Sequence, residues 1–343
     1  MKQHLNTLFV TTQDAYLAKE GEAVVVKIEK EVRLRVPIHH LGGIVCFGRV
    51  GMSPWLMGLC AEAGVTVSFL TENGRFLAAV HGYTRGNVLL RREQYRRADD
   101  ATAATAIARN IVCAKLANAR TVLLRGARDH RDGPGRTALD EAAGRLAWSV
   151  QKAAQTADRD TLRGIEGDGA SIYFGAFPQL VTTQQHDFTM TGRTRRPPLD
   201  PMNTLLSFLY AMLAHDARSA CEASGLDAAV GFLHTDRPGR PGLALDLMEE
   251  FRPVLADRLA LSLVNRAQVR SEGFVRSESG AVLMDDATRK AVIAAYQKRK
   301  QAVVTHPFLG EKTTAGLLVH LQARLLARHL RGDLDAYPPF IWR

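Results

Sequence analysis

The chain has 343 residues, of which 46% are hydrophobic, and 45 basic residues against 35 acidic ones give it a net charge of +10. This length is typical of a globular protein with about two domains, and the basic charge favours polyanionic partners, either nucleic acid or an anionic membrane surface. No apolar run approaches the roughly 20 residues that span a bilayer, and the apolar stretch near the N-terminus is too short for a signal peptide. We therefore expect a cytoplasmic protein without a membrane segment.

The first 80 residues predict strands, because their apolar residues alternate or form short β-branched runs. The expected strands cover residues 7–10, 15–29, 31–38 and 65–80, with one short helix at 58–64. In the third strand Val32, Leu34 and Val36 alternate with arginines, as on a half-buried strand. Asn73-Gly74 interrupts the fourth segment and predicts a type I′ hairpin turn.

Residues 85–100 are polar and basic, and we expect them to link two domains or to form the first helix of the second one. Their four arginines are Arg91, Arg92, Arg96 and Arg97. A run of charges is usually a solvated helix face, and contact with nucleic acid is the alternative.

From residue 101 onward the pattern is helical. Helices are expected within residues 102–127, 138–177, 202–225, 243–270, 285–303 and 313–332, with Pro253 as an interruption. Because strands and helices occupy separate parts of the chain, a parallel sheet of βαβ units is not expected. We predict an α+β protein with a small β-rich N-terminal domain (1–84), a linker (85–100) and a larger all-α catalytic domain (101–343).

Residues 231–253 combine a histidine with two carboxylates. His234 precedes a basic loop rich in proline and glycine, and Asp246 and Glu249 are three positions apart, so they share one face of a helix. Such a group can bind Mn²⁺ or Mg²⁺, because carboxylate oxygens suit hard divalent cations and imidazole tolerates Mn²⁺. In a chain this basic, the group indicates chemistry on a phosphodiester backbone.

Each of these candidates also has a simpler interpretation. Glu166 is flanked by glycines and can simply favour a helix dipole near a helix start, although the glycines also allow a ligand to come close. His234 can be a hydrogen-bonded core residue, and Asp246 and Glu249 can form a solvated helix face. Their apolar neighbours argue against a solvated face, since a carboxylate in such a segment needs a partner.

Three arginines lie near this group, namely Arg237, Arg240 and Arg252. They are candidates for DNA contact because a guanidinium matches phosphate geometry with two hydrogen bonds; the alternative is that they are ordinary surface residues. The sequence contains no P-loop, GxGxxG, HExxH or GxSxG element. Ser207 and Ser219 have no evident general base, which argues against a serine hydrolase.

Three separated segments together resemble the CRISPR-associated adaptation integrases, the Cas1 family. They are GIEGDGASIYF (164–174), DPMNTLLSFLYAML (200–213) and GFLHTDRPGRPGLALDLMEEFRP (231–253). The likeness extends over essentially the whole chain, including HGY at 81–83 and YPPFIWR at 337–343. The wording of the tail and of residues 236–253 most resembles the subtype I-C branch.

The resemblance implies a metal site made of Glu166, His234 and Glu249, with Asp246 as a further acidic residue that assists it. Asn203 would orient local structure and not bind metal. The implied cofactor is Mn²⁺ or Mg²⁺, and the N-terminal domain would carry dimer and partner contacts. The implied assembly is a homodimer in complex with the second adaptation protein, Cas2, which joins the 3′-hydroxyl ends of a double-stranded prespacer to CRISPR leader-repeat DNA.

Two other functions stay open at this point. A metal-dependent nuclease or junction-resolving repair enzyme would use the same residues to hydrolyse DNA without joining it. A basic, non-catalytic DNA-binding scaffold would not need the chemistry of the three implied metal ligands, so alanine at Glu166, His234 or Glu249 would leave its activity unchanged.

Overall fold

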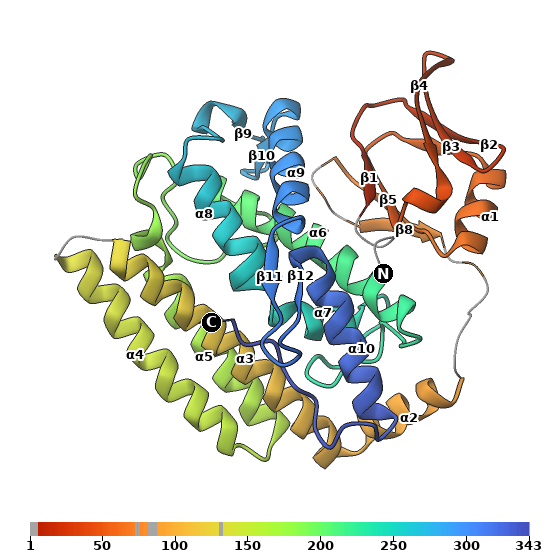
Figure 1. Ribbon diagram of the computed structural model, residues 1–343. Helices are drawn as coiled ribbons and strands as arrows, with labels where there is room; N and C mark the ends of the chain where they lie inside the picture. Colours follow the sequence, from red (N-terminus) through yellow and green to blue (C-terminus); the bar gives the residue numbers. More distant parts are fainter. Residues whose placement is uncertain are drawn as a thin grey trace. The chain divides into compact units, whose positions relative to one another are not determined.

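The computed structural model describes residues 6–72, 74, 76–80, 82, 88–129 and 133–342. The chain divides into two compact units, Met1–Gly86 and Asn87–Arg343. The first is rich in strands and the second is mainly helical (Figure 1), so the predicted α+β class is confirmed. Residues that we expected to link two domains form helix α2 (Val88–Asp99) of the second unit.

The first unit contains two four-stranded sheets. One has the order β1-β5-β7-β8 and consists of β1 (Thr7–Val10), β5 (Gly43–Phe47), β7 (Thr66–Leu70) and β8 (Phe76–Val80). The other has the order β4-β3-β2-β6 and consists of β2 (Tyr16–Glu20), β3 (Ala23–Ile28), β4 (Glu31–Pro37) and β6 (Gly51–Met52). Leu17, Ile44 and Leu56 are fully buried in their common core, to which helix α1 (Pro54–Ala63) contributes.

The expectation that the chain lacks parallel βαβ arrangements is wrong for the first unit. Strands β5 and β7 are parallel neighbours, and α1 lies between them in the chain. The sequence pattern does not predict β5, because all five residues of this strand are buried and its apolar residues do not alternate with polar ones. Helix α1 also begins earlier than expected, behind Ser53, whose hydroxyl accepts a hydrogen bond from the Leu56 amide at 3.3 Å.

Strand β4 is a strand as predicted, but it is not half-buried. Val32 is 49% exposed and Leu34 is 43% exposed, so no layer of the described residues covers this face of β4, which is an edge strand. The expected hairpin between β7 and β8 is confirmed by their antiparallel pairing, but its last pair is Leu70 with Phe76, so the connection is longer than the two-residue type I′ turn that we expected. Gly74 has a φ of 83° there, while Asn73 lies outside the described residues.

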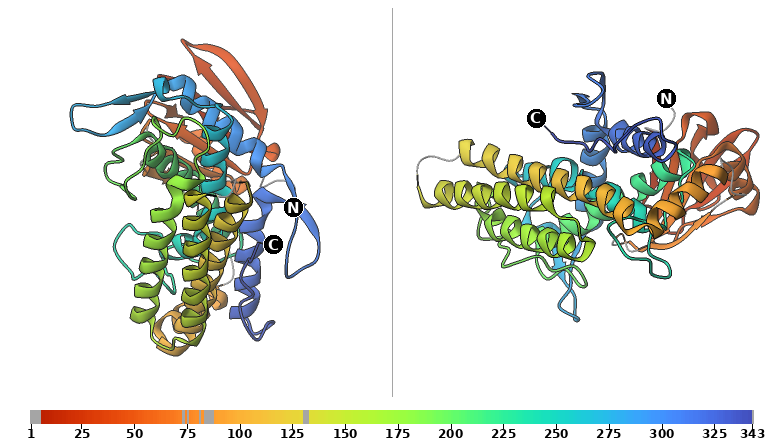
Figure 2. Two further views of the ribbon diagram at one scale, coloured as in Figure 1. Left: turned by 90° about the vertical axis from the view of Figure 1, so that its left-hand side faces the viewer. Right: turned by 90° about the horizontal axis from the view of Figure 1, so that it is seen from below.

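The second unit is mainly helical. Its α-helices are α2, α3 (Ala101–Asp129), α4 (Pro134–Gln155), α5 (Arg159–Ala176), α6 (Pro201–Ala223), α7 (Gly242–Glu249), α8 (Arg258–Asn265), α9 (Asp286–Lys300) and α10 (Leu318–Leu330). Helices α3, α4 and α5 lie side by side (Figures 1 and 2). Behind α7 the chain forms a π-helical turn at Arg252–Asp257, where Pro253 removes a backbone donor.

The prediction of an all-α second domain is wrong in detail. Two short hairpins, β9 (Phe274–Arg276) with β10 (Val282–Met284) and β11 (Val303–Thr305) with β12 (Lys312–Thr314), lie in this unit. Each strand has three residues, which is too short for a period of two to stand out from the neighbouring helical pattern. Residues 312–317, which include the expected start of the last helix, form β12 and a 3₁₀ turn.

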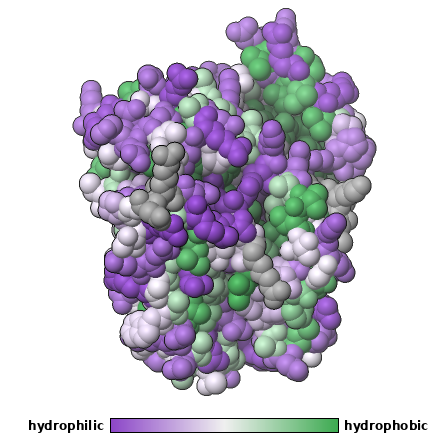
Figure 3. All heavy atoms as spheres, turned by 60° about the vertical axis from the view of Figure 1, so that its left-hand side comes forward, coloured by the Kyte–Doolittle hydropathy of each residue, from purple (hydrophilic) through white to green (hydrophobic). Residues whose placement is uncertain are grey.

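Within the described part of the chain, no helix combines the length and the apolar character that crossing a membrane requires. Hydrophilic and hydrophobic residues are interspersed over the face drawn in Figure 3.

Candidate metal and DNA-processing site

A tight loop brings residues 228–234 against the start of α7. The amide of Gly242 donates to the carbonyl of Ala229 at 3.0 Å, and that of Leu243 donates to Ala228 at 3.0 Å. A Cβ atom on Gly231 would lie 2.7 Å from Oδ2 of Asp246, so only glycine allows the loop to approach the helix this closely. The packing fixes the backbone on which His234 stands.

Asp246 is fully buried and organises this loop. Its Oδ2 accepts hydrogen bonds from the amides of Phe232 at 2.6 Å and Leu233 at 2.9 Å. Its Oδ1 accepts from the amide of His234 at 3.0 Å and lies 2.6 Å from Nδ1 of the same residue. With four donors already on its two oxygens, Asp246 holds His234 and its loop in place.

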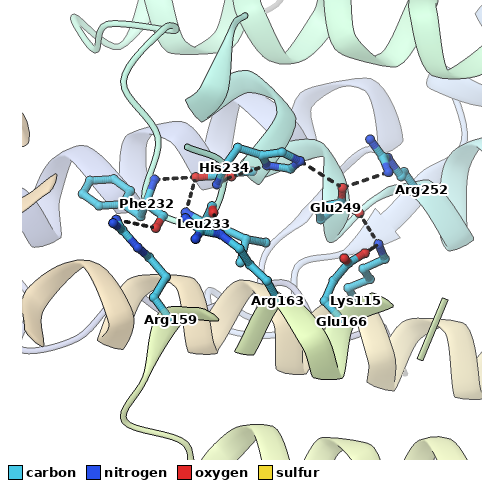
Figure 4. A network of polar contacts seen from close by, with 10 residues as sticks. Lys115, Arg159, Arg163, Glu166, Phe232, Leu233, His234, Glu249 and Arg252 are labelled. Carbon is cyan, nitrogen blue, oxygen red and sulfur yellow. Dashed lines mark hydrogen bonds and ion pairs between the residues drawn. The ribbon is translucent and has the colours of Figure 1, made fainter. Parts of the chain in front are cut away.

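The contact between Asp246 and Nδ1 determines the tautomer of His234. Because the carboxylate accepts, we assign the proton to Nδ1, which leaves a lone pair on Nε2. Nε2 lies 4.0 Å from Oε1 of Glu249 (Figure 4). The side chain of His234 is 18% exposed.

Glu249 ends α7 and is almost completely buried, with 2% of its side chain exposed. Its Oε1 lies 2.8 Å from a terminal nitrogen of Arg252, and its Oε2 lies 2.7 Å from Nζ of Lys115. Burial alone would raise the pKa of this carboxyl group, but the Arg252 guanidinium and the Lys115 ammonium lower it to about 2. Glu249 is therefore ionised at neutral pH.

Glu166 reaches the same ammonium from α5. Its Oε1 forms an ion pair with Nζ of Lys115, and 25% of its side chain is exposed. Glu166 lies in the middle of α5, which begins at Arg159 behind the N-cap Asp158, so the simple helix-dipole interpretation is wrong. A Cβ atom added to the neighbouring Gly164 or Gly167 would meet nothing within 4 Å, so open space lies beside both glycines.

The structure thus brings together all four predicted acidic and histidine residues. Arg163, one turn before Glu166, donates from Nε to the carbonyl of Leu233 at 2.8 Å and so ties α5 to the His234 loop (Figure 4). The solvated-face interpretation is wrong for Asp246 and Glu249, because both are buried. As the side chains stand, no three His, Cys, Asp or Glu groups among the described residues converge closely enough to hold a metal ion.

The three candidate arginines have different environments. Arg252 is only 13% exposed and is engaged with Glu249. Its guanidinium also lies 4.9 Å from the ring centre of Tyr210, whose hydroxyl donates to Asp257 at 2.7 Å. Arg237 is exposed and Arg240 is half-buried, both in the loop that follows His234.

Asn203 has the orienting position that we expected. Its Oδ1 accepts from Arg193 at 2.7 Å and from the Thr194 amide at 3.0 Å, and its Nδ2 donates to the Gly192 carbonyl at 2.8 Å. These bonds attach the loop before α6 to the first turn of that helix. Asn203 itself is fully buried.

Sequence reasoning missed Lys115, and it missed the group that fixes the C-terminal segment. Glu250 accepts from the Tyr337 hydroxyl at 2.6 Å, the Phe340 amide at 2.7 Å and Nε2 of Gln322 at 3.0 Å. A signal for Lys115 existed: it lies four residues after Ile111 and four before Ala119, on the apolar face of an expected helix.

The fold and the site together define the class of this protein. It is an α+β protein with a β-rich unit, a mainly helical unit, and a histidine–carboxylate cluster within the helical unit. The sequence profile of the family described as CRISPR associated protein Cas1 matches residues 8–298. The chain belongs to this Cas1 family, and the predicted family is confirmed.

Two relatives match over the whole chain. The CRISPR-associated endonuclease Cas1 1 of Chlorobaculum tepidum is 53% identical over 343 residues, covering 100% of both chains. The CRISPR-associated endonuclease Cas1 2 of Rhodospirillum rubrum is 53% identical over 347 residues, again covering 100% of both.

Solved structures share the fold. A Cas1 protein from Thermotoga maritima has a TM-score of 0.83 at 22% identity and covers 98% of this chain and 100% of that one. A casposase bound to an integration product has a TM-score of 0.84 at 21% identity and covers 98% of this chain and 94% of that one. These likenesses extend over both units.

Proposed function

We propose that this protein is a metal-dependent DNA integrase of CRISPR adaptation, which joins prespacer 3′-hydroxyl ends to leader-repeat DNA. One observation supports this most strongly. Glu166 and Glu249, from two different helices, meet at one cation, and a histidine with a free Nε2 lies 4.0 Å from Glu249. This donor set occurs in a chain of net charge +10 whose relatives are named CRISPR-associated endonucleases.

The chemistry of the donor set suits Mn²⁺ or Mg²⁺, and the side chains would have to close around the ion, because they do not converge on one point as they stand. Glu166 and Glu249 would supply carboxylate oxygens, and His234 would supply Nε2, the nitrogen without a proton in the neutral tautomer that the contact between Asp246 and Nδ1 selects. When bound, such an ion stabilises negative charge on a phosphate and orients nucleophile and leaving group. Both carboxylates face a cation already, so their geometry suits a positive charge.

The reaction would be a transesterification. The 3′-oxygen of the prespacer attacks the phosphorus in line, a new P–O bond forms, and the bond to the 3′-oxygen of the repeat strand breaks. One phosphodiester bond forms for the one that breaks, so the step needs no external energy source, and the proton lost by the attacking hydroxyl is balanced by the proton gained by the leaving oxygen. Arg252 keeps Glu249 ionised and in place, while Arg237 and Arg240, in the loop after His234, would pair with DNA phosphates.

We further propose that the protein acts in the cytoplasm as a homodimer together with Cas2, and that it belongs to the subtype I-C branch. The tail at 337–343 and residues 236–253 support the branch. A CRISPR array and a gene for a small second adaptation protein beside this gene would support the assembly. Exposed apolar residues on the first unit, among them Trp55 at 81% exposure, suit contacts with other chains.

A strand-transfer assay tests the function. A labelled duplex with 3′-hydroxyl ends would be mixed with a leader-repeat plasmid, the partner protein and either Mn²⁺, Mg²⁺ or EDTA. We expect metal-dependent joined product that disappears in Glu166→Ala, His234→Ala and Glu249→Ala and when the 3′ end is blocked. Asp236→Asn, an exposed change two residues from His234, is the matched control and should retain activity.

The same assay separates the competing functions. Metal-dependent cutting without joined product would show that the protein is a nuclease that uses water as nucleophile and not an integrase. If the protein binds DNA and the three alanine variants are as active as the unmodified protein, the non-catalytic scaffold is the correct function.

A further inference from the structure

Lys115 is a buried cation on a mainly apolar face of helix α3. It lies in the middle of α3, where Ile111, Val112 and Ala119 are buried, and its side chain is 10% exposed. An ammonium group in such a place is costly unless it is paired. The structure therefore has to contain a reason for a lysine at this position.

The reason is the pair of carboxylates at the candidate metal site. Nζ of Lys115 lies 2.7 Å from Oε2 of Glu249 and also forms an ion pair with Oε1 of Glu166 (Figure 4). Two carboxylates that share one small space repel each other unless a cation lies between them. Lys115 and Arg252 together supply two positive charges against the two negative charges of Glu166 and Glu249.

We infer that Lys115 is the resident counter-ion of the metal site, which holds the two carboxylates together without metal and is displaced when a divalent cation binds them. This inference rests on the proposed function, because it assumes that Glu166, His234 and Glu249 bind metal. The ammonium contacts the same two carboxylates that a metal would bind, and a dication beside an ammonium would be repelled at short range.

Of the two cations beside the carboxylates, Lys115 is more easily displaced by a metal ion than Arg252 is. A lysine ammonium is a point charge on a flexible four-carbon stem, whereas a guanidinium is planar and rigid. Arg252 contacts only Glu249 of the two carboxylates and also lies over the ring of Tyr210 at 4.9 Å. Displacement of Lys115 makes metal affinity a competition between two cations, so this lysine weakens metal binding while it stabilises the metal-free protein.

The test compares Mn²⁺ affinity and thermal stability in Lys115→Met and Lys115→Gln. Free Mn²⁺ is measured by electron paramagnetic resonance, and the melting temperature is measured in EDTA and in Mn²⁺. We expect both variants to melt lower in EDTA, to bind Mn²⁺ at least about tenfold more tightly, and to gain more from Mn²⁺ than the unmodified protein does.

Lys300→Met is the matched control. Lys300 is another buried lysine, 5% exposed, and its Nζ lies 3.0 Å from Oδ1 of Asp216. Its loss should lower the melting temperature in EDTA and leave Mn²⁺ affinity unchanged. If the Lys115 variants bind Mn²⁺ equally or less tightly than the unmodified protein, Lys115 does not compete with the metal and the inference is overturned.

A measurement on the unmodified protein covers the case in which neither Lys115 variant folds. Displacement predicts that Lys115 reacts faster with an acylating reagent in Mn²⁺ than in EDTA, with Lys300 as an internal reference, and unchanged labelling overturns the inference. If the unmodified protein binds no Mn²⁺ at all, the proposed metal site fails as well. If it binds Mn²⁺ and His234→Ala does not, a negative result at Lys115 overturns only the inference.

Discussion

Nδ1 of His234 lies 2.6 Å from Oδ1 of Asp246, and this contact directs the other ring nitrogen toward Glu249. Asp246→Asn removes one of the two acceptor oxygens that four donors now share. We expect Mn²⁺ affinity and strand transfer to fall by roughly 10- to 100-fold, the usual effect of losing the partner of a metal-binding histidine. We expect this loss because the His234 ring would no longer be held in one orientation, and its proton would be shared between the Nδ1 and Nε2 tautomers.

Calorimetric titration with Mn²⁺ and the strand-transfer assay measure the effect of Asp246→Asn. Asp285→Asn is the control, because Asp285 accepts a hydrogen bond from the Thr288 amide at 2.7 Å at the start of α9, far along the chain from the site. An Asp246→Asn protein that binds Mn²⁺ with full affinity would show that this contact has no role in metal binding.

The three arginines should separate by function. Arg237→Gln and Arg240→Gln remove charges from the loop after His234, and each should lower the slope of log affinity against log salt by about 1 if it contacts a phosphate. Arg252→Gln should leave the slope unchanged, because its guanidinium is bound to Glu249. Instead it should lower the free energy of unfolding by about 3–5 kcal/mol, since Glu249 stays buried with one cation fewer.

Fluorescence anisotropy of a labelled duplex at several salt concentrations gives the slopes, and urea unfolding gives the stabilities. A reduced slope in Arg252→Gln, with unchanged slopes in the other two variants, would reverse this assignment.

His215 gives the protein a sensitivity to acid. Burial, with help from the Lys300 and Arg218 charges and against the Asp216 carboxylate, lowers the pKa of this imidazole to about 4 from an ordinary value of 6.5. The folded state therefore favours the neutral ring, and the resulting stability is complete above pH 6.5 and is lost as the pH falls toward 4. The loss should reach about 2.5 kcal/mol at pH 4.5.

The measurement compares urea unfolding at pH 7 and pH 4.5 for the unmodified protein and His215→Gln. Asp257 also titrates in this range: burial raises its pKa to about 6, so it stabilises the fold as the pH falls. The effect of His215 is therefore the difference between the pH dependences of the two proteins. Equal pH dependence in the two proteins would show that His215 does not titrate in this way.

The sequence predicted most of what is local along the chain. His234, Asp246 and Glu249 lie within one segment, so their spacing on a loop and a helix could be read directly. The long helices were predictable because their apolar residues repeat with a period near 3.6. Strand β5 was not, because a short run that is buried on all sides has no period.

The partners of buried charges could not be predicted, because they are tertiary contacts. The position of Lys115 on an apolar helix face indicated that it needed an acid, but no pattern connects α3 with Glu166 on α5 or with Glu249 on α7. In the same way, the alternation in β4 predicted a strand without indicating whether another layer covers Val32 and Leu34.

Asn118 is the clearest example of such a contact. Its Nδ2 donates to the carbonyls of Glu250 at 2.7 Å and Phe340 at 2.9 Å, and its Oδ1 accepts from the Trp342 amide at 2.7 Å. One buried side chain thereby connects α3, the residue after Glu249 and the C-terminal segment. The ring of Trp342 lies in addition 3.6 Å from the guanidinium of Arg125.

Asn118→Ala should therefore destabilise the protein and loosen the metal site together. Three backbone groups lose their partners, at about 1 kcal/mol each, so the free energy of unfolding should fall by about 3 kcal/mol. Asn110→Ala is the control, because Asn110 makes one bond of this kind, to the Tyr337 carbonyl at 2.9 Å, and should cost about 1 kcal/mol.

Urea unfolding measures the two costs, and hydrogen exchange at the Phe340 and Trp342 amides locates the change. Faster exchange at both amides in Asn118→Ala is expected, because the Phe340 amide binds the carboxylate of Glu250 and would move with it. Since Glu250 follows Glu249 directly, Mn²⁺ affinity should weaken in the same variant and stay unchanged in Asn110→Ala. Equal costs for the two variants would mean that Asn118 does not connect the C-terminal segment to the site.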